Sequence, residues 1–400
     1  MFPWQSGSDG QEQTEDVNLN PRSLRWVPDN SYLQRHVSSA VAYNVWQYFQ
    51  ITDDLEFLQF YGAELILETA RFWSSIATFN NERRRYEIRG VMGPDEFHER
   101  YPNSPTPGLN NNAYTNVMAV WVVWRALEVL DRLPELRRGE LTASLGLSAD
   151  ETARWDDISR KMYVPFHGDG LISQFEGYDE LAELDWEHYR TRYGNIQRLD
   201  LILEAENDST NCYKASKQAD VLMLFYLFSG EELGELFKRL GYPFEDDIIA
   251  RNVSYYVSRS SHGSTLSRVV HAWVLARINR PRAMTYFEQA LQSDLSDIQQ
   301  GTSAEGVHLG AMAGTVDLVQ RALMGIEVTG DALRLNPQLP KDIKRFEMRM
   351  RYRGHSLDLW LTSNMLTVRD RDHGAAPIAL QIGKDTYKLA AGSTLDVRLS

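Results

Sequence analysis

Residues 113–132 read AYTNVMAVWVVWRALEVLDR, and the spacing of their apolar side chains is a strong structural signal. Val117, Val120, Trp121 and Trp124 recur at steps of three and four residues. This period is typical of a helix with a wide apolar face. Such a face must be covered by other elements, so the stretch predicts a helix packed inside a larger body.

Similar apolar stripes occur on both sides of this stretch. Toward the N-terminus, Leu33, Val37, Val41 and Val45 recur every four residues and predict a helix, whereas residues 1–30 have no apolar period and are expected to be loop. Further helices are expected over residues 55–77, 148–158 (which opens with the capping-box spacing of Ser148 and Glu151), 217–229, 231–240, 264–279, 282–293 and 311–324. A chain of helices whose connecting loops carry the polar residues is the layout of a helical barrel.

Toward the C-terminus the period changes to two. Phe346, Met348 and Met350 alternate with charged residues, which is typical of a strand with one buried face. Further strands are expected over residues 357–361, 366–368, 378–382 and 395–399. The sequence therefore predicts a helical domain over residues 1–325 and a small β-domain over residues 326–400.

The composition narrows the function classes. The chain has 400 residues and a formal net charge of −13, with no basic cluster, so nucleic acid is not an expected partner. No apolar run reaches the length of a membrane span, and the start has no signal-peptide pattern. The one cysteine, Cys212, fits a reducing compartment. We expect a soluble cytoplasmic protein.

The loop at residues 90–112 is too long for a routine connection, and long ordered loops are often functional. It contains Gly93-Pro94-Asp95-Glu96, a rigid corner that carries two carboxyl groups. Partial burial of a carboxyl group there would raise its pKa enough for general acid catalysis. The alternative is an acidic loop exposed to water, which is the commoner fate of charged loops.

Two further polar segments lead into helices. Asn112 follows Asn110 and Asn111, and these amides either bind sugar hydroxyls or cap the following helix. Lys217 and Gln218 open an apolar helix, where they either face a ligand or form a solvated first turn.

Residues 260–267 read SSHGSTLS and run directly into a helix. Free backbone N–H groups at a helix N-terminus, with hydroxyl groups and a histidine, make a small-anion site. The alternative is an N-cap with nothing bound. A last segment, residues 301–314, is rich in small residues and contains Glu305 and His308, which are either catalytic or brace a cleft.

The sequence motifs of several other enzyme classes are absent. The sequence has no P-loop, no dinucleotide fingerprint after a strand, no His-Glu-x-x-His helix and no nucleophile elbow. Glu96, His98 and Glu99 are crowded, but no second cluster of metal ligands accompanies them. We therefore expect no metal site.

Taken together and in this order, the polar segments resemble glycoside hydrolase family 65, the family of maltose, trehalose and kojibiose phosphorylases. The resemblance covers nearly the whole chain. One of these segments alone would mean little, but their occurrence together in the family's order is highly specific. The matching stretches are FPWQSG (2–7), His36 with Tyr43 and Trp46, GPDEFH (93–98), NAYTN (112–116), KQAD (217–220), HGSTLS (262–267) and residues 301–314.

The resemblance implies an (α/α)6 barrel followed by a small C-terminal β-sandwich. It implies inverting phosphorolysis of an α-glucosyl disaccharide of the trehalose, maltose or kojibiose type, with Glu96 as general acid. Inorganic phosphate is the implied co-substrate, no cofactor is implied, and the products are β-glucose 1-phosphate and a free sugar. The implied sugar-binding residues are Trp4, Asp95, Asn112, Lys217, Gln218 and Glu305, and the implied phosphate-binding residues are His262, Gly263, Ser264 and Thr265.

Phosphate is favoured over water as the nucleophile. An inverting hydrolase needs a second carboxylate as base, roughly 6.5–9.5 Å from the acid. A phosphorylase needs none, because phosphate is already an anion, and the sequence offers a donor-rich segment at residues 262–265 instead. The alternatives are an inverting α-glucoside hydrolase, trehalase-like, with Glu305 or another acid as base, and an inactive remnant that binds sugar or a partner.

The chain departs from the family pattern at its start. Family members carry a β-sandwich, a linker and the first barrel helices ahead of the stretch that matches residues 2–7. We therefore expect a barrel that is incomplete at its N-terminus. The resemblance also implies a homodimer, for which the sequence shows no interface signature.

Overall fold

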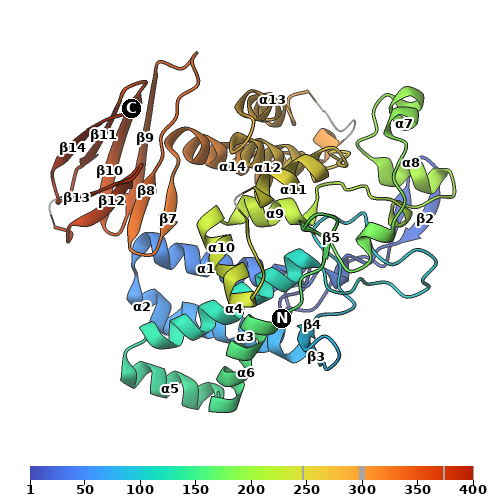
Figure 1. Ribbon diagram of the computed structural model, residues 1–400, viewed down its shortest axis with the longest axis horizontal. Helices are drawn as coiled ribbons and strands as arrows, with labels where there is room; N and C mark the ends of the chain where they lie inside the picture. The colour runs from blue at the N-terminus through green and yellow to red at the C-terminus, as the bar shows by residue number, and fades with distance from the viewer. Residues whose placement is uncertain (246, 297–301, 373, 400) are drawn as a thin grey trace.

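The computed structural model describes residues 1–245, 247–296, 302–372 and 374–399, and only the backbone of residues 302, 305 and 329. Figure 1 shows a helical body with a β-domain on one side of it. At the opposite end of the body lie α7 (Trp186–Tyr193), α8 (Leu199–Ala205) and the hairpin of β1 (Val17–Asn20) and β2 (Arg25–Pro28) (Figure 1). No helix in these ranges has both the length and the apolar character needed to cross a bilayer.

The helical body has two layers. In the first layer, helices pack side by side in chain order: α1 (Val37–Thr52), α4 (Ala113–Arg132), α9 (Asp220–Leu227), α12 (Thr265–Ala276) and α14 (Leu309–Val319). The helices that pack against this layer are α3 (Ala63–Ile76), α6 (Ala149–Lys161), α10 (Gly230–Leu240), α11 (Ile248–Val257) and α13 (Arg280–Leu291). The helices α2 (Leu55–Phe57) and α5 (Glu135–Leu145) and the π-helical turns η2 (Leu58–Gly62) and η6 (Gln320–Met324) complete the body. This architecture confirms the α/α-barrel class expected from the sequence.

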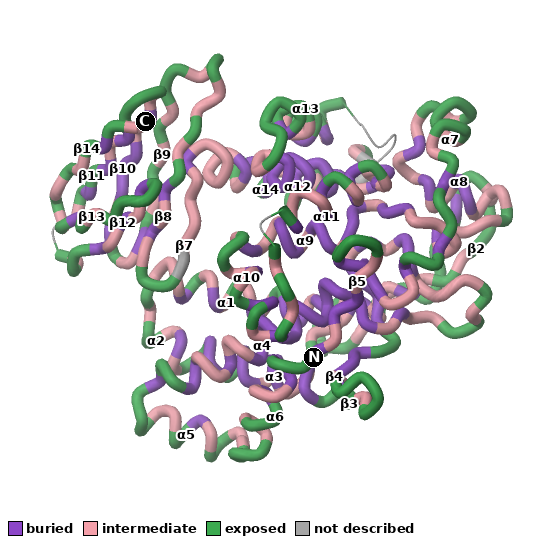
Figure 2. Tube along the Cα trace, in the orientation of Figure 1, coloured by how far each residue is buried: buried purple, intermediate pink, exposed green. Residues whose placement is uncertain are grey.

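Helix α4 illustrates how the sequence produces the layers. Asn112 caps it by accepting the backbone N–H of Thr115 at 2.9 Å. Val117, Val120 and Trp121 are fully buried, and each such side chain stabilises the fold by about 1.5–3 kcal/mol. Figure 2 shows the buried chain concentrated in α9 and α12 as well, whereas much of α13 is exposed.

Two expectations about secondary structure were wrong. Residues 1–30 are not all loop, because β1 and β2 pair as an antiparallel hairpin. The side chains of this hairpin are mostly exposed, so they give no apolar period, and Asn20 Nδ2 bonds to the carbonyl of Leu201 in α8 at 3.0 Å. Helices α5, α7, α8 and α11 (Ile248–Val257) were also missed; α7 has no buried residue and α5 only one, whereas α8 and α11 are short helices with several buried residues.

The β-domain is a sandwich of two four-stranded sheets with the orders β14-β11-β10-β9 and β13-β12-β8-β7. Leu357, Leu359 and Leu361 of β10 are fully buried between the sheets, and Leu359 lies opposite Met348 of β9 in antiparallel register. The strands are β7 (Glu327–Thr329), β8 (Ala332–Leu335), β9 (Arg345–Tyr352), β10 (His355–Thr362), β11 (Met365–Asp370), β12 (Ile378–Ile382), β13 (Asp385–Leu389) and β14 (Thr394–Arg398). The alternation predicted for this region is confirmed.

Two short hairpins lie in the helical body, β3 (Thr78–Asn80) with β4 (Arg85–Glu87) and β5 (Phe166–His167) with β6 (Leu171–Ile172).

The loops that precede α4, α9 and α12 meet at one end of the first layer. Ser261 donates its backbone N–H to the carbonyl of Ser216 at 2.8 Å, which joins the loops before α12 and α9. Asp95 donates its backbone N–H to Asp220 Oδ1 at 2.7 Å, which joins the loop before α4 to the start of α9. Three of the polar segments found in the sequence therefore form one site.

Candidate active site

Glu96 lies in a tight turn that folds over the N-terminus of α9. Its φ angle is +63°, a left-handed conformation that non-glycine residues rarely adopt. Three residues earlier, Gly93 passes so close to α9 that a Cβ atom there would overlap the carboxyl group of Asp220. Only glycine fits at this position without a shift of the chain, so contact with Asp220 holds the shape of the turn.

Two buried carboxyl groups lie behind the turn. Asp95 and Asp220 are each 2% exposed. Asp95 Oδ1 accepts the backbone N–H of Lys217 at 2.6 Å, and Asp220 Oδ2 accepts Nδ2 of Asn112 at 2.6 Å. Burial, and then the charge of Asp95, raise the pKa of Asp220 well above its usual value. Because both groups are bonded to the protein, they position the turn.

The carboxyl group of Glu96 differs from these two because its side chain is 30% exposed. One oxygen forms an ion pair with Nζ of Lys217, and the other accepts Nε2 of Gln34 at 3.2 Å. Glu96 is thus oriented by two side chains and remains open to a substrate oxygen, as a general acid requires.

The His262–Thr265 segment enters the site from the start of α12. Ser264 caps this helix by accepting the backbone N–H of Leu266 at 3.2 Å. Within the part of the chain that the structure describes, the backbone N–H groups of Gly263, Ser264 and Thr265 donate no hydrogen bond. Free N–H groups at a helix N-terminus are the donors that bind small anions.

The imidazole of His262 is occupied by protein partners. Its Nδ1 lies 3.1 Å from Ser267 Oγ and 3.0 Å from His271 Nδ1, and its Nε2 lies 3.1 Å from the hydroxyl of Tyr286. Both ring nitrogens of His262 are therefore bonded within the protein, and the backbone N–H groups of the segment are the donors left for an anion.

Positive charge gathers around the same segment. Burial, and then the charges of Arg268, Arg282 and Arg190, lower the pKa of His262 to about 3. These arginines come from α12, α13 and α7, so their proximity could not be predicted from the sequence. Their field favours an anion although the whole chain is acidic.

Lys217 connects the two halves of the site. A Cβ atom on Gly263 would lie 3.1 Å from Cγ of Lys217, while the ammonium group of the same lysine contacts Glu96. Glu96 and the anion-binding segment are therefore separated by about the length of one side chain.

The other residues expected in the site differ in accessibility. Trp4 is half-buried, with its ring 5.8 Å from that of His36. Gln218 is 8% exposed, and its buried Oε1 has no hydrogen-bond partner among the described residues. Both side chains remain candidates for sugar binding.

Asn112 and Asp95 were expected among the sugar-binding residues, and the structure shows the protein groups to which each is bonded. Asn112 is fully buried, with Oδ1 capping α4 and Nδ2 bonded to Asp220. Asp95 is held in the same way by backbone N–H groups of α9. The side chain of Glu305 lies outside the described residues. Asp220 accepts hydrogen bonds from both Asp95 and Asn112. It belongs to the stretch 217–220, but the sequence predicted no role for it.

No metal ligand set accompanies the site. In the described ranges, no group of three or more histidine, cysteine, aspartate or glutamate side chains is arranged to hold a metal ion. The anion-binding groups of the site are instead backbone N–H groups, arginines and one lysine.

His36 makes the stability of the folded chain depend on pH. Burial lowers its pKa to about 4, against the opposing charge of Glu96. The unfolded chain takes up a proton on this histidine near pH 6.5, whereas the folded chain does so only near pH 4. The unfolded state therefore binds more protons between these values, and the free energy of unfolding falls as the pH decreases through this window.

We expect His36 to account for a loss of roughly 1 kcal/mol per pH unit between about pH 6 and pH 4.5. Urea unfolding at several pH values should show a shallower pH dependence in His36→Gln than in the wild type, whatever the stability of the variant at pH 7. The exposed His188 provides the control, because His188→Gln should keep the wild-type dependence. A dependence unchanged in His36→Gln would contradict this assignment.

Known proteins match the chain over nearly its whole length. Residues 1–317 match the glycosyl hydrolase family 65 central catalytic domain, and residues 326–389 match the C-terminal domain of that family. An uncharacterized glycosyl hydrolase of Mycobacterium tuberculosis is 55% identical over 100% of the chain, which corresponds to 30% of that protein. The trehalose 6-phosphate phosphorylase of Lactococcus lactis is 36% identical over 98% of the chain and 49% of its own length.

Two further relatives are kojibiose phosphorylases. That of Caldanaerobacter subterraneus is 32% identical over 92% of the chain and 45% of its own length. A solved structure assigned as a kojibiose phosphorylase from the human microbiome shares the fold, with a TM-score of 0.73 and 22% identity over 91% of the chain and 49% of that structure. The chain thus spans less than half the length of each of these relatives.

Proposed function

The chain belongs to glycosyl hydrolase family 65, and from this membership and the geometry around Glu96 we propose that it catalyses the inverting phosphorolysis of an α-glucoside. The proposal depends on one observation, the close approach of Lys217 to both Glu96 and Gly263 of the His262–Thr265 segment. One sugar ring between them would meet a proton donor on one face and an anion on the other.

Phosphate suits this site better than an activated water. The two carboxyl groups behind Glu96 belong to Asp95 and Asp220, and both are buried and bonded to the protein. Neither can act as the base that an inverting hydrolase needs. Free N–H groups and nearby arginines can hold a phosphate dianion without a base.

In the proposed reaction, Glu96 gives its proton to the glycosidic oxygen as the bond from that oxygen to C1 of the glucosyl unit breaks. A phosphate oxygen forms the new bond to C1 from the opposite face, which inverts the configuration and yields β-glucose 1-phosphate. The hydrogen of the attacking hydrogen phosphate restores the proton on Glu96, so the protons balance.

Lys217 can contact both reactants. Its ammonium group pairs with Glu96. A phosphate bound at Gly263 and Ser264 offers Lys217 a second anion, and the ammonium can then turn away from Glu96, which leaves that carboxyl group free to meet the glycosidic oxygen.

The relatives suggest which acceptors to test. They include phosphorylases of trehalose 6-phosphate, kojibiose and nigerose. We propose an α-linked glucosyl unit as the shared donor, with the second unit to be identified by experiment.

The protein should be incubated with trehalose, trehalose 6-phosphate, maltose, kojibiose and nigerose, each with and without inorganic phosphate. We expect β-glucose 1-phosphate from at least one of these substrates, and only when phosphate is present. Equal release of glucose in both arms would instead establish the hydrolase alternative, with Glu305 as the candidate base. No turnover in any arm would leave the binding remnant as the better description.

A further inference from the structure

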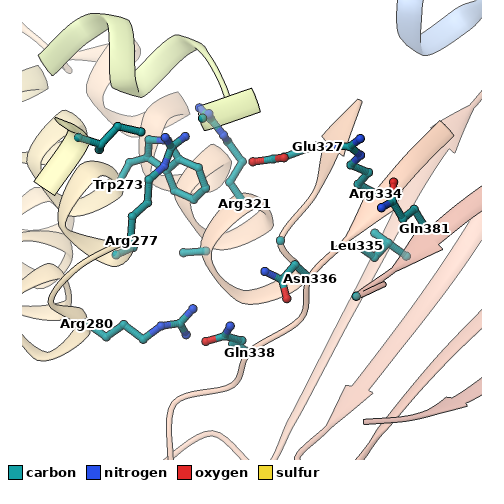
Figure 3. Close-up of a pocket in the computed structure, with 16 residues that line it drawn as sticks. Trp273, Arg277, Arg280, Arg321, Glu327, Arg334, Leu335, Asn336, Gln338 and Gln381 are labelled. Carbon is teal, nitrogen blue, oxygen red and sulfur yellow. The ribbon is translucent and has the colours of Figure 1, made fainter. Parts of the chain in front are cut away.

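A second polar cavity lies between the helical body and the β-domain, with a volume of about 800 Å³. We call it the arginine cavity because Arg277, Arg280, Arg321 and Arg334 line it, together with Glu327 (Figure 3). Its volume is within the range of small-molecule sites. Four arginines against one glutamate are unexpected in a chain whose net charge is −13.

Structural contacts account for two of the arginines. Arg321 donates Nη2 to the carbonyl of Tyr226 at 2.7 Å and pairs with Asp317 at 3.3 Å. Arg334 of β8 pairs with Glu231 of α10 and so joins the two domains. These two guanidinium groups have their counter-charges within the protein.

Among the described residues, Arg277 and Arg280 have no carboxylate partner. Arg277 makes one hydrogen bond, from Nη2 to the carbonyl of Phe228 at 3.0 Å, and neither arginine has a carboxylate within 4 Å among the described residues. Burial, and then the charge of Arg321, lower the pKa of Arg277 to about 10. Figure 3 shows the guanidinium group of Arg280 extending toward Gln338.

We propose that the arginine cavity binds the phosphate group of a hexose-sized phosphorylated molecule through Arg277 and Arg280. Guanidinium forks match phosphate oxygens in geometry, and a partly desolvated cation gains when an anion joins it. Asn336, Gln338 and Gln381 line the same cavity, and their amides offer donors and acceptors to sugar hydroxyls (Figure 3).

The cavity is distinct from the candidate active site. Helix α12 begins beside Ser264 and ends at Ala276, next to Arg277. A helix of this length spans about 18 Å, so a phosphate in the cavity cannot be the nucleophile of the proposed reaction. The two sites lie at opposite ends of α12, and binding in the cavity does not depend on the proposed function.

Calorimetric titration of the full chain with glucose 6-phosphate, and separately with glucose, tests the proposal. We expect a glucose 6-phosphate site whose affinity falls at least about 10-fold in Arg280→Glu, with a smaller loss in Arg280→Gln. Glucose should show no binding that depends on Arg280. The side chain of Arg280 bonds to no described residue, so thermal unfolding should be close to that of the wild type.

Lys384→Glu is the matched control. It makes the same change of charge in the turn after β12, beside the cavity residue Gly383, but Lys384 does not line the cavity. We expect it to lower the affinity less than about twofold, through long-range electrostatics alone. Equal losses in Arg280→Glu and Lys384→Glu, or no loss in Arg280→Glu, would overturn the proposal.

Discussion

Replacing Glu96 with glutamine is expected to lower the rate of phosphorolysis by about 10²- to 10⁴-fold. Glutamine keeps the shape of the side chain and can still bond to Gln34, but it has no acidic proton to give to the departing sugar. The affinity for phosphate should not fall, because the N–H groups of Gly263 and Ser264 are untouched and Lys217 is no longer paired with a carboxylate at position 96. Initial rates of β-glucose 1-phosphate formation at several phosphate concentrations measure both effects.

Glu99→Gln provides the control within the same loop. Glu99 lies three residues further on, accepts a hydrogen bond from Asn30 and pairs with Arg100 at 3.8 Å. Burial raises the pKa of Glu99, so it resembles a general acid when judged on electrostatics alone. We expect a far smaller loss of rate than in Glu96→Gln. Equal losses in the two variants would show that the loop tolerates no substitution and that Glu96 has no special role.

The long buried helices could be predicted from apolar spacing alone. Helix α4 covers the same residues, 113–132, as the expected helix, and Ser148 caps α6 with the predicted hydrogen bond from Glu151. In such helices, the need to bury one face produces the apolar spacing that is visible in the sequence. Among the elements that were missed, α7 and the β1–β2 hairpin bury little surface, and the hairpin is held by a contact with a distant part of the chain. Helices α5, α8 and α11 were missed as well, although α11 buries Ile248, Val253 and Tyr256.

The polar segments of the site could also be predicted from the sequence, but the role of each side chain within them could not. Asn112 looks like a sugar ligand until its partner Asp220, 108 residues away, is found to occupy its amide. His262 looks like a phosphate ligand until Tyr286 and His271 are found against its ring. Composition identifies the groups that can bind a ligand, whereas only the three-dimensional fold decides which of them are already bonded to the protein.

Replacing Gly93 with alanine is expected to lower the free energy of unfolding by about 3 kcal/mol. The new Cβ would overlap the carboxyl group of Asp220 and would lie 2.5 Å from Nδ2 of Asn112. Both neighbours are buried, so either the turn moves or the hydrogen bond between them breaks. Glu96 lies three residues further on, and a displacement of about 1 Å can cost roughly 100-fold in rate.

Gly139→Ala is the matched control, because it adds the same methyl group elsewhere. Gly139 is an exposed position in α5 with nothing within 4 Å of the new atom, so alanine there should stabilise the chain by about 0.5–1 kcal/mol. Urea unfolding should therefore give changes of opposite sign in the two variants. In Gly93→Ala, kcat should fall while the KM for phosphate stays near the wild-type value, because the phosphate segment is built on α12. Wild-type stability and kcat in Gly93→Ala would mean that the close approach to Asp220 does not position Glu96.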